Sequence, residues 1–260
     1  EHMDAQNRID PTWLDRVQTV VDWALDRGMY VIVNAHHDAW YEPDPAKLQT
    51  AVATLRDVWE QIATRFQTYD THLLFEGMNE PRLLGHPQEW AAGTPEARAC
   101  VNTLNAAFVA AVRATGGENA TRYLLVPAYA ANVREDALAA LALPADSHLM
   151  VSAHLYAPYD FALNEAGTAD WSPDSEADTR ELREAFETLK RMFVSRGVPV
   201  VVTEFGAVDK HNEAARAAWA TTVTRLAQES RIPCLWWDTA LLCTQTQTWR
   251  YPALLTAIAH

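Results

Sequence analysis

The stretches LLFEGMNEP at residues 73–81 and VVVTEFG at residues 200–206 decide the fold of this 260-residue chain. Each is a short apolar run followed by polar residues, with Glu80 in the first stretch and Glu204 in the second. Such runs are typical of strands that are buried on both faces in a parallel sheet covered by helices. A glutamate at the end of such a strand is costly to bury, and residues at this end of parallel strands are often catalytic. We therefore predict that Glu80 and Glu204 end two strands of one sheet and form a catalytic pair, with structural ion pairs as the alternative.

Helical and strand-like segments alternate along the rest of the chain. Asp10-Pro11 is a typical helix start, and Gly28 is a typical end for the same helix. Repeated strand–helix units form a parallel sheet, and no linker divides the chain, so the sequence predicts one α/β domain over residues 1–260. The apolar patterns predict helices at 10–27, 46–68, 96–114, 133–142, 176–196, 212–230 and 251–259, and strands at 29–34, 72–78, 122–127, 147–153, 198–203 and 232–237.

Polar and aromatic residues gather at the ends of nearly all the predicted strands. An open doubly wound sheet concentrates its site in one crevice, whereas a barrel collects site residues from many strand ends. The distribution therefore favours a barrel. In chain order, the strand-end residues are Asn34, His36, His37, Asp38, Asn79, Glu80, Tyr129, His154, Tyr156, Glu204, Trp236, Trp237 and Asp238.

Charge and composition argue against several classes of protein. The net charge is −13 and the chain has no block of Lys or Arg, so we expect neither nucleic acid nor an anionic membrane as partner. No apolar run reaches the length of about 18 residues that a membrane helix needs, and no export signal is visible. The three cysteines lie far apart, so neither a disulfide framework nor a cysteine metal site is expected. The ten tryptophans favour a carbohydrate cleft, because flat rings stack on sugar faces.

Five motifs stand at the strand ends in chain order: YVIVNAHHD at 30–38, NEP at 79–81, HLY at 154–156, TEFG at 203–206 and WWD at 236–238. Together they resemble glycoside hydrolase family 5, and among its members most of all the bacterial endo-β-1,4-glucanases, or cellulases. The resemblance implies a (β/α)8 TIM barrel that cleaves cellulose or β-glucan with no metal and no organic cofactor. It also implies a retaining mechanism, with Glu80 as acid/base and Glu204 as nucleophile. Retention requires the two carboxyl groups to lie about 5–5.5 Å apart.

Further residues are expected to bind the polysaccharide. Asn79 stands beside the acid and is suited to bind the sugar 2-hydroxyl, a contact that strengthens in the transition state. Tyr156 is expected to donate a hydrogen bond to Glu204, and Trp237 is expected to form the floor under the cleaved sugar. The other expected substrate-binding residues are His36, His37, His154 and Trp40, with Trp171 as a looser candidate.

Several of these residues also have a simpler structural interpretation. Adjacent histidines project to opposite sides of a strand, so His36, His37 and Asp38 are not expected to hold a metal, and one of the two histidines is expected to be structural. His72 and His148 begin strands at the opposite end from the site, which predicts structural roles. Four tryptophans follow helical patterns and are predicted to pack rather than to bind sugar, namely Trp13, Trp23, Trp59 and Trp219.

The motifs match strands three to eight of an eight-stranded barrel. Parallel sheet edges are therefore expected beside residues 29–34 and 232–237, and exposed edges tend to pair with another chain. This predicts a homo-oligomer that covers the open edge. A mannanase or xyloglucanase on the same scaffold is an alternative function, and so is a truncated, catalytically weak relative that binds β-glucan. The family resemblance also implies a secreted or periplasmic location.

Overall fold

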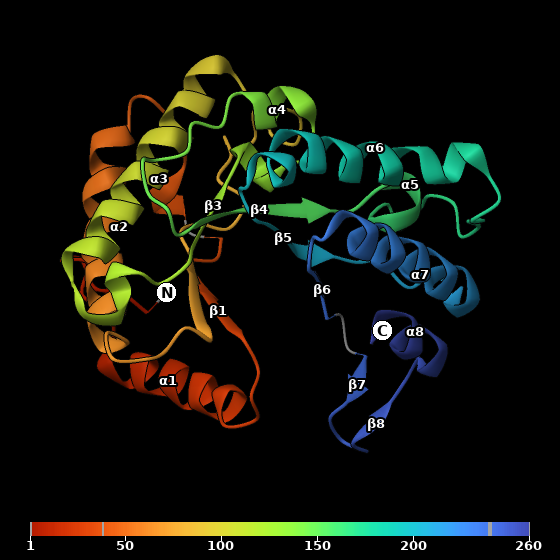
Figure 1. Cartoon of the computed structure of the whole chain (residues 1–260), viewed down its shortest axis with the longest axis horizontal. Coiled ribbons are helices and arrows are strands. Elements are labelled where there is room, and N and C mark those ends of the chain that lie inside the picture. The colour runs from red at the N-terminus through yellow and green to blue at the C-terminus, as the bar shows by residue number, and fades with distance from the viewer. Residues whose placement is uncertain (1, 38, 239–240, 260) are drawn as a thin grey trace. The chain divides into compact units, whose positions relative to one another are not determined.

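Strands and helices alternate along the chain in the structure, a computed structural model that describes residues 2–37, 39–238 and 241–259 (Figure 1). In these ranges the main sheet has the strand order β1-β2-β3-β4-β5-β6. The recorded pairs β1–β2, β2–β3, β3–β4 and β5–β6 run parallel. The strands are β1 (Val31–Asn34), β2 (Leu73–Glu76), β3 (Leu124–Pro127), β4 (Leu149–Leu155), β5 (Val200–Phe205) and β6 (Cys234–Trp236).

Helices follow or precede each strand of the main sheet. They are α1 (Pro11–Leu25), α2 (Leu48–Arg65), α3 (Pro95–Ala114), α4 (Glu135–Ala139), α5 (Tyr159–Ala162), α6 (Glu176–Met192), α7 (Glu213–Ser230) and α8 (Pro252–Ile258). Short 3₁₀ turns are η1 (Ala39–Tyr41), η2 (Gly117–Ala120), η3 (Tyr129–Ala131) and η4 (Val194–Arg196). A small antiparallel hairpin, β7 (Leu242–Cys243) with β8 (Thr248–Trp249), precedes α8.

The chain forms two compact units, and the division passes through β4. The first unit consists of the chain up to Asn132 together with Asp136–Ser152. The second consists of Val133–Glu135 together with the chain from Ala153 onward. The first unit therefore holds the start of the sheet, and the second holds the end of β4 with β5 and β6. The expectation of a single domain stays a prediction.

The core of the first unit fixes the end of β2. Trp59 of α2 is fully buried, and its ring lies 5.3 Å from that of Phe75 and 4.6 Å from that of Phe108 on α3. The Trp59 Nε1 donates a hydrogen bond to the carbonyl oxygen of Gly77, 2.9 Å away. A Cβ atom at Gly77 would lie 2.7 Å from the Phe108 ring, so glycine is what allows this close approach. The packing thus sets the backbone three residues before Glu80.

The core of the second unit fixes the end of β5 in the same way. Trp219 of α7 is fully buried and its ring contacts those of Phe205 and Trp236, with centroids 5.9 Å and 6.2 Å away. Its Nε1 donates a hydrogen bond to the carbonyl oxygen of Ala157, 2.9 Å away. Phe205 directly follows Glu204, so the aromatic packing positions the backbone that carries this glutamate.

The predicted order of strands and helices is confirmed, and the differences lie at the ends of elements. β4 continues to Leu155 and β5 to Phe205, so His154 and Glu204 stand inside their strands rather than after them. Helix α4 is shorter than the predicted 133–142 segment, and both α5 and the β7–β8 hairpin are additional. No helix in the described ranges is long and apolar enough to cross a membrane.

The four tryptophans that were predicted to pack divide into two pairs. Trp59 and Trp219 are fully buried, which confirms that prediction for them. Trp13 and Trp23 of α1 are 42% and 52% exposed, so the prediction is wrong for both. The physical reason is that α1 turns Val21 and the partly buried Leu14, Val17 and Leu25 toward the core, which leaves both tryptophans on its exposed side.

Candidate active site

Asn79 and Glu80 follow β2 in the first unit, as predicted from the sequence. Asn79 is 1% exposed; its backbone N–H donates to the carbonyl oxygen of Ala35, 2.8 Å away, and its own carbonyl accepts from the Tyr41 hydroxyl at 2.8 Å. Neither polar atom of its side chain has a hydrogen-bond partner within the described residues. A buried amide without partners costs free energy unless a ligand supplies them. The Asn79 side chain is therefore prepared for a polar ligand.

Glu80 has a left-handed backbone conformation, with φ +43°. Non-glycine residues rarely adopt this conformation, and where they do, the strain is often part of a functional site. The Glu80 side chain is 11% exposed, and its Oε2 lies 3.6 Å from Nη1 of Arg82. The same Nη1 donates to the Glu80 carbonyl oxygen at 3.2 Å. Arg82 thus holds both the backbone and the carboxylate of this residue.

A cavity of about 70 Å³ adjoins Glu80 in the first unit. Residues from the loop after β2 form one side of it, and residues from the loop after β1 form the other. Both sets come from the ends of neighbouring parallel strands, where binding sites in such sheets are found. The lining residues are His37, Ala39, Tyr41, Glu42, Glu80, Arg82 and Leu84.

The two histidines after β1 differ from their prediction. Their rings contact each other edge to face, with centroids 4.4 Å apart, so they do not project to opposite sides. The strand ends at Asn34, and His37 has φ +55°, so strand alternation no longer applies at this point. His37 lines the cavity, and the His36 Nδ1 lies 3.4 Å from Nδ2 of Asn34. Asp38, which was considered with them as a metal ligand, lies outside the described residues.

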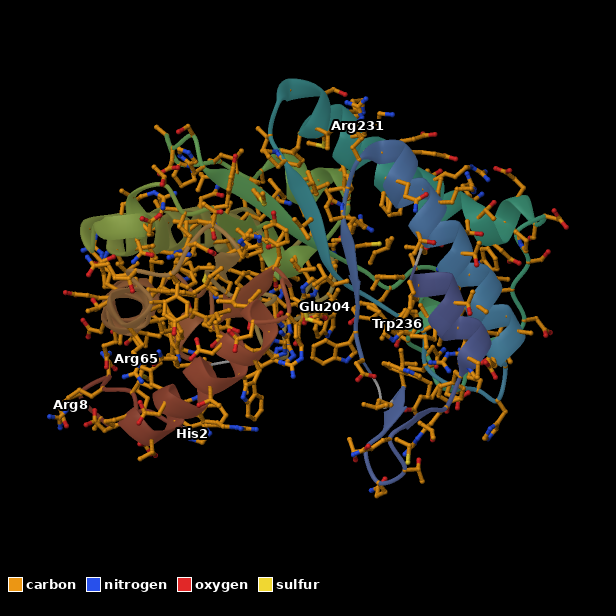
Figure 2. All side chains as sticks on the ribbon, turned by 60° about the horizontal axis from the view of Figure 1, so that its bottom comes forward. His2, Arg8, Arg65, Glu204, Arg231 and Trp236 are labelled. Atoms are coloured by element: carbon orange, nitrogen blue, oxygen red, sulfur yellow. The ribbon has the colours of Figure 1, made fainter. Side chains whose placement is uncertain are left out.

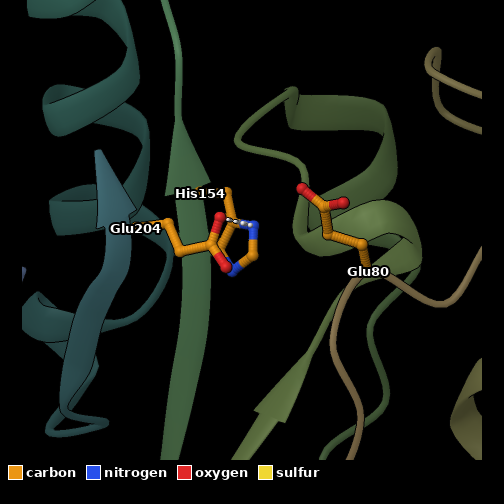
Figure 3. A group of neighbouring side chains, drawn as sticks. All are labelled: Glu80, His154 and Glu204. Atoms are coloured by element: carbon orange, nitrogen blue, oxygen red, sulfur yellow. Dashed lines mark ion pairs between the residues drawn. The ribbon is translucent and has the colours of Figure 1, made fainter. Parts of the chain in front are cut away.

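Glu204 is held by two neighbours within the second unit. The Tyr156 hydroxyl donates a hydrogen bond to Oε2 of Glu204 at 2.8 Å, which confirms the predicted contact. His154 Nδ1 lies 3.3 Å from the same oxygen, an ion pair that Figure 3 draws as a dashed line. Only 4% of the His154 side chain and 11% of the Glu204 side chain is exposed. The Tyr156 hydrogen bond stabilises the negative charge of this nearly buried carboxylate, and a protonated His154 would add a second charge-stabilising contact at the same oxygen.

The tryptophans at the end of β6 face different environments. Trp236, labelled with Glu204 in Figure 2, is half-buried and its ring lies edge to face with that of Phe205, 5.3 Å away. Trp237 is 43% exposed, and its backbone N–H donates to the Phe205 carbonyl at 2.8 Å. Trp237 therefore has the exposure that a sugar platform needs, and its backbone is fixed to β5.

The other two cleft candidates are less exposed. Trp171 is buried and its Nε1 donates to the carbonyl oxygen of Asp178 at 3.2 Å, so its assignment to a cleft is wrong. Its ring centre lies 6.3 Å from that of Phe161, and only 7% of the residue is exposed, so little of the ring is open to a sugar. Trp40 is half-buried; it lies edge to face with Tyr41 and packs against the core of the first unit.

Two charged residues near the end of β2 were not predicted. Glu76 is buried and accepts a hydrogen bond from Nδ2 of Asn34 at 3.0 Å. Glu76 could have been identified as unusual from the sequence, because it is a charged residue in an otherwise apolar strand. Arg82 gave no such signal, since an arginine on a loop is usually a solvated charge. Only its contacts with Glu80 show its importance.

Comparison with known proteins gives the family. The cellulase family, glycosyl hydrolase family 5, matches residues 1–240. The chain belongs to glycosyl hydrolase family 5. It is 42% identical over 264 residues to endoglucanase B of Ruminococcus albus. The matched region covers 97% of this chain but only 63% of the length of that relative.

Solved structures give the fold. A GH5-4 broad specificity endoglucanase from Clostridium acetobutylicum has a TM-score of 0.96 and 38% identity, covering all of this chain and 82% of the other. A second GH5-4 broad specificity endoglucanase, from Ruminococcus champanellensis with bound cellotriose, has a TM-score of 0.94 and 41% identity. This match covers 100% of this chain and 79% of the other. The fold class predicted from the sequence, an α/β fold of the TIM-barrel type with six parallel strands, is confirmed, and so is the resemblance to family 5.

Proposed function

We propose that this chain is an endo-β-1,4-glucanase that hydrolyses internal bonds of cellulose or β-glucan with retention of configuration. The observation that supports the proposal best is the Glu204 carboxylate, which Tyr156 and His154 hold at one oxygen. A nucleophilic carboxylate must be ionised and correctly oriented before it attacks, and the Tyr156 hydrogen bond with the His154 contact favours both conditions. Membership of family 5 and the endoglucanase relatives support the same reaction.

The proposed reaction has two steps. In the first, Glu204 attacks the anomeric carbon to form a glycosyl-enzyme while Glu80 gives its proton to the leaving glycosidic oxygen. In the second, Glu80 takes a proton from water, and the water oxygen displaces Glu204 from the anomeric carbon. The two oppositely directed displacements restore the original configuration. Both carboxyl groups end in the state in which they began.

The surrounding residues would bind the sugar in this proposal. The buried Asn79 amide, which has no hydrogen-bond partner among the residues that the structure describes, would bind the 2-hydroxyl of the glucose unit that is attacked. The exposed Trp237 would stack beneath the same sugar. His37 lines the cavity beside Glu80 and would contact a neighbouring sugar, with His36 next to it. Trp40, which is half-buried, would contribute the part of its side chain that remains exposed.

The two glutamates can be separated experimentally. Glu204→Gln should abolish hydrolysis both of β-glucan and of an aryl β-cellobioside, because no nucleophile remains. Glu80→Gln should no longer hydrolyse β-glucan. It should still carry out the first step on an aryl cellobioside with a good leaving group, because the departure of that group needs little acid assistance. Glu187→Gln on the exposed surface of α6 is the matched control and should behave like the wild type. Identical behaviour of the two site variants on the aryl substrate would contradict the assigned roles.

The preferred polymer, the location and the oligomeric state stay predictions. Initial rates on carboxymethylcellulose, mixed-linkage β-glucan, mannan and xyloglucan would decide between the glucanase and its mannanase and xyloglucanase alternatives. Retention of the chain in a β-glucan gel without any sugar release would instead indicate a weakly catalytic binding protein. A secreted or periplasmic location fits a polymeric substrate. Sedimentation velocity at micromolar concentration tests the expected homo-oligomer, and a monodisperse monomer would contradict it.

A further inference from the structure

The loop between β2 and α3 presents a large aromatic side chain close in sequence to Glu80. Trp90 is 58% exposed, the highest value among the tryptophans of the described residues. The guanidinium carbon of Arg82 lies 4.1 Å from the centre of its ring, which is within the range of a cation–π contact. One face of the indole is thus covered by a cation, and a large part of the ring remains in contact with solvent.

Arg82 joins this ring to Glu80. Its Nε donates to Oε1 of Glu89 at 3.0 Å, while its Nη1 donates to the Glu80 carbonyl at 3.2 Å and lies 3.6 Å from Oε2 of Glu80. The Arg82 side chain is only 15% exposed, so these contacts constrain it tightly. A single planar group therefore touches the backbone and the carboxylate of Glu80 and also supports the Trp90 ring.

The loop itself is fixed by hydrogen bonds at several points. Oε2 of Glu89 accepts from the backbone N–H of Gly85 at 2.8 Å. The Tyr129 hydroxyl accepts from the backbone N–H of Leu83 at 2.9 Å, and burial raises the pKa of this tyrosine. Asn132 Nδ2 donates to the carbonyl oxygen of Ala91 at 3.2 Å. An exposed tryptophan on a loop held in this way loses little conformational entropy when it binds a ligand.

We propose that Trp90 is a stacking platform for a glucose unit on the leaving-group side of the cleaved bond, and that Arg82 positions it. The inference rests on the proposed function, in which Glu80 protonates the leaving oxygen. Because Arg82 contacts both Glu80 and Trp90, the ring is tied to the side of the bond on which that oxygen departs. The C–H groups on one face of a β-linked glucose unit pack against an aromatic face, which gives the chemical class of the ligand.

The structure offers a matched control for this pair. Trp23 of α1 is 52% exposed, and the guanidinium carbon of Arg16 lies 5.2 Å from its ring centre. The chemistry and exposure resemble those of the Trp90 pair, but Trp23 belongs to a helix far from Glu80 in the sequence. If any exposed arginine–tryptophan pair were enough to affect the reaction, variants at both positions would behave alike.

Two substrates separate the platform from the chemical step. Cellohexaose needs glucose units on both sides of the cleaved bond, whereas β-cellobiosyl fluoride loses only a fluoride ion and places no sugar on the leaving-group side. Trp90→Ala should lower kcat/KM for cellohexaose about tenfold, as expected for the loss of one aromatic contact, and leave fluoride release within about twofold of wild type. Trp90→Phe should recover most of the loss, and Trp23→Ala should change neither rate.

The positioning role of Arg82 has its own readout. Arg82→Met retains the aliphatic stem but removes the cation, and it should raise KM for cellohexaose with a smaller effect in the background of Trp90→Ala. Equal losses on both substrates for Trp90→Ala, or no loss on cellohexaose, would overturn the inference. If the wild type hydrolysed neither substrate, the proposed function would fail instead. Retardation in a β-glucan gel would then test the platform, and equal mobility of wild type and Trp90→Ala would refute it.

Discussion

Replacement of the buried Arg122 by lysine should strongly destabilise the protein. Arg122 directly precedes Tyr123 at the start of the β3 region, is 1% exposed, and burial lowers the pKa of its guanidinium. Its five side-chain hydrogen bonds all go to neutral oxygens, and its guanidinium carbon lies 4.9 Å from the centre of the Phe75 ring. It donates five hydrogen bonds, to Asn119 Oδ1 (2.7 Å) and to the carbonyl oxygens of Phe66 (3.1 Å), Tyr69 (2.6 Å), Asp70 (2.9 Å) and Leu73 (2.6 Å).

The size of the effect follows from the number of donors. A lysine ammonium group has three N–H donors, so at least two of the five hydrogen bonds are lost. Each buried acceptor left without a partner costs about 1–3 kcal/mol, which gives about 2–6 kcal/mol for Arg122→Lys. This is a large part of a total stability of about 5–15 kcal/mol, so the variant should unfold at a much lower urea concentration. Because Leu73 begins β2, the clamp also supports the strand that leads to Glu80.

Urea denaturation followed by circular dichroism measures this change. Arg56→Lys is a suitable control, since Arg56 is exposed on α2 of the same unit. The control should unfold at the wild-type midpoint, while Arg122→Lys should unfold at a clearly lower one. A midpoint for Arg122→Lys equal to that of the control would show that water or rearranged side chains satisfy the carbonyl groups, and the reasoning would be refuted.

Three further predictions concern single contacts. Tyr156→Phe removes the 2.8 Å hydrogen bond to the charged Glu204 carboxylate. A hydrogen bond to a charged group contributes about 1.5–3 kcal/mol, so kcat/KM on β-glucan should fall roughly 10- to 150-fold. An unchanged initial rate would contradict the role of Tyr156. The Arg113 guanidinium lowers the pKa of Asp146 from 3.8, so this pair stabilises the fold above that pH and loses its effect as pH falls through the lower folded pKa. Asp146→Asn should therefore lower the urea midpoint at pH 7 but much less near pH 2, and equal losses at both would argue against the ion pair. Hydrogen bonds from a threonine in the β7–β8 turn lower the pKa of the partly exposed Cys243 to about 7. Iodoacetamide should therefore label this thiol half-maximally near that pH, and a midpoint close to 9 would contradict the prediction.

The sequence alone was sufficient for the order of elements and for the position of the two glutamates. Apolar runs such as 73–75 and 200–202 are short and continuous, and in a parallel sheet that pattern has few other solutions. Polar residues directly after such runs must lie at one edge of the sheet. The sequence is therefore enough to place Glu80 and Glu204 at strand ends, and the resemblance to family 5 was enough to predict the hydrogen bond from Tyr156.

The tertiary structure decided which side chains are covered and which are available. Trp59 and Trp23 follow the same helical periodicity, yet one is fully buried and the other half exposed, because burial depends on what packs against the helix. The contacts of Arg82 depend on a loop conformation that no periodicity encodes, and the left-handed backbone of Glu80 is equally invisible in the sequence. Periodic patterns report the local backbone, whereas exposure and loop contacts depend on residues distant in the chain. The site residues could thus be named from the sequence, but the support for Trp90 could be found only in three dimensions.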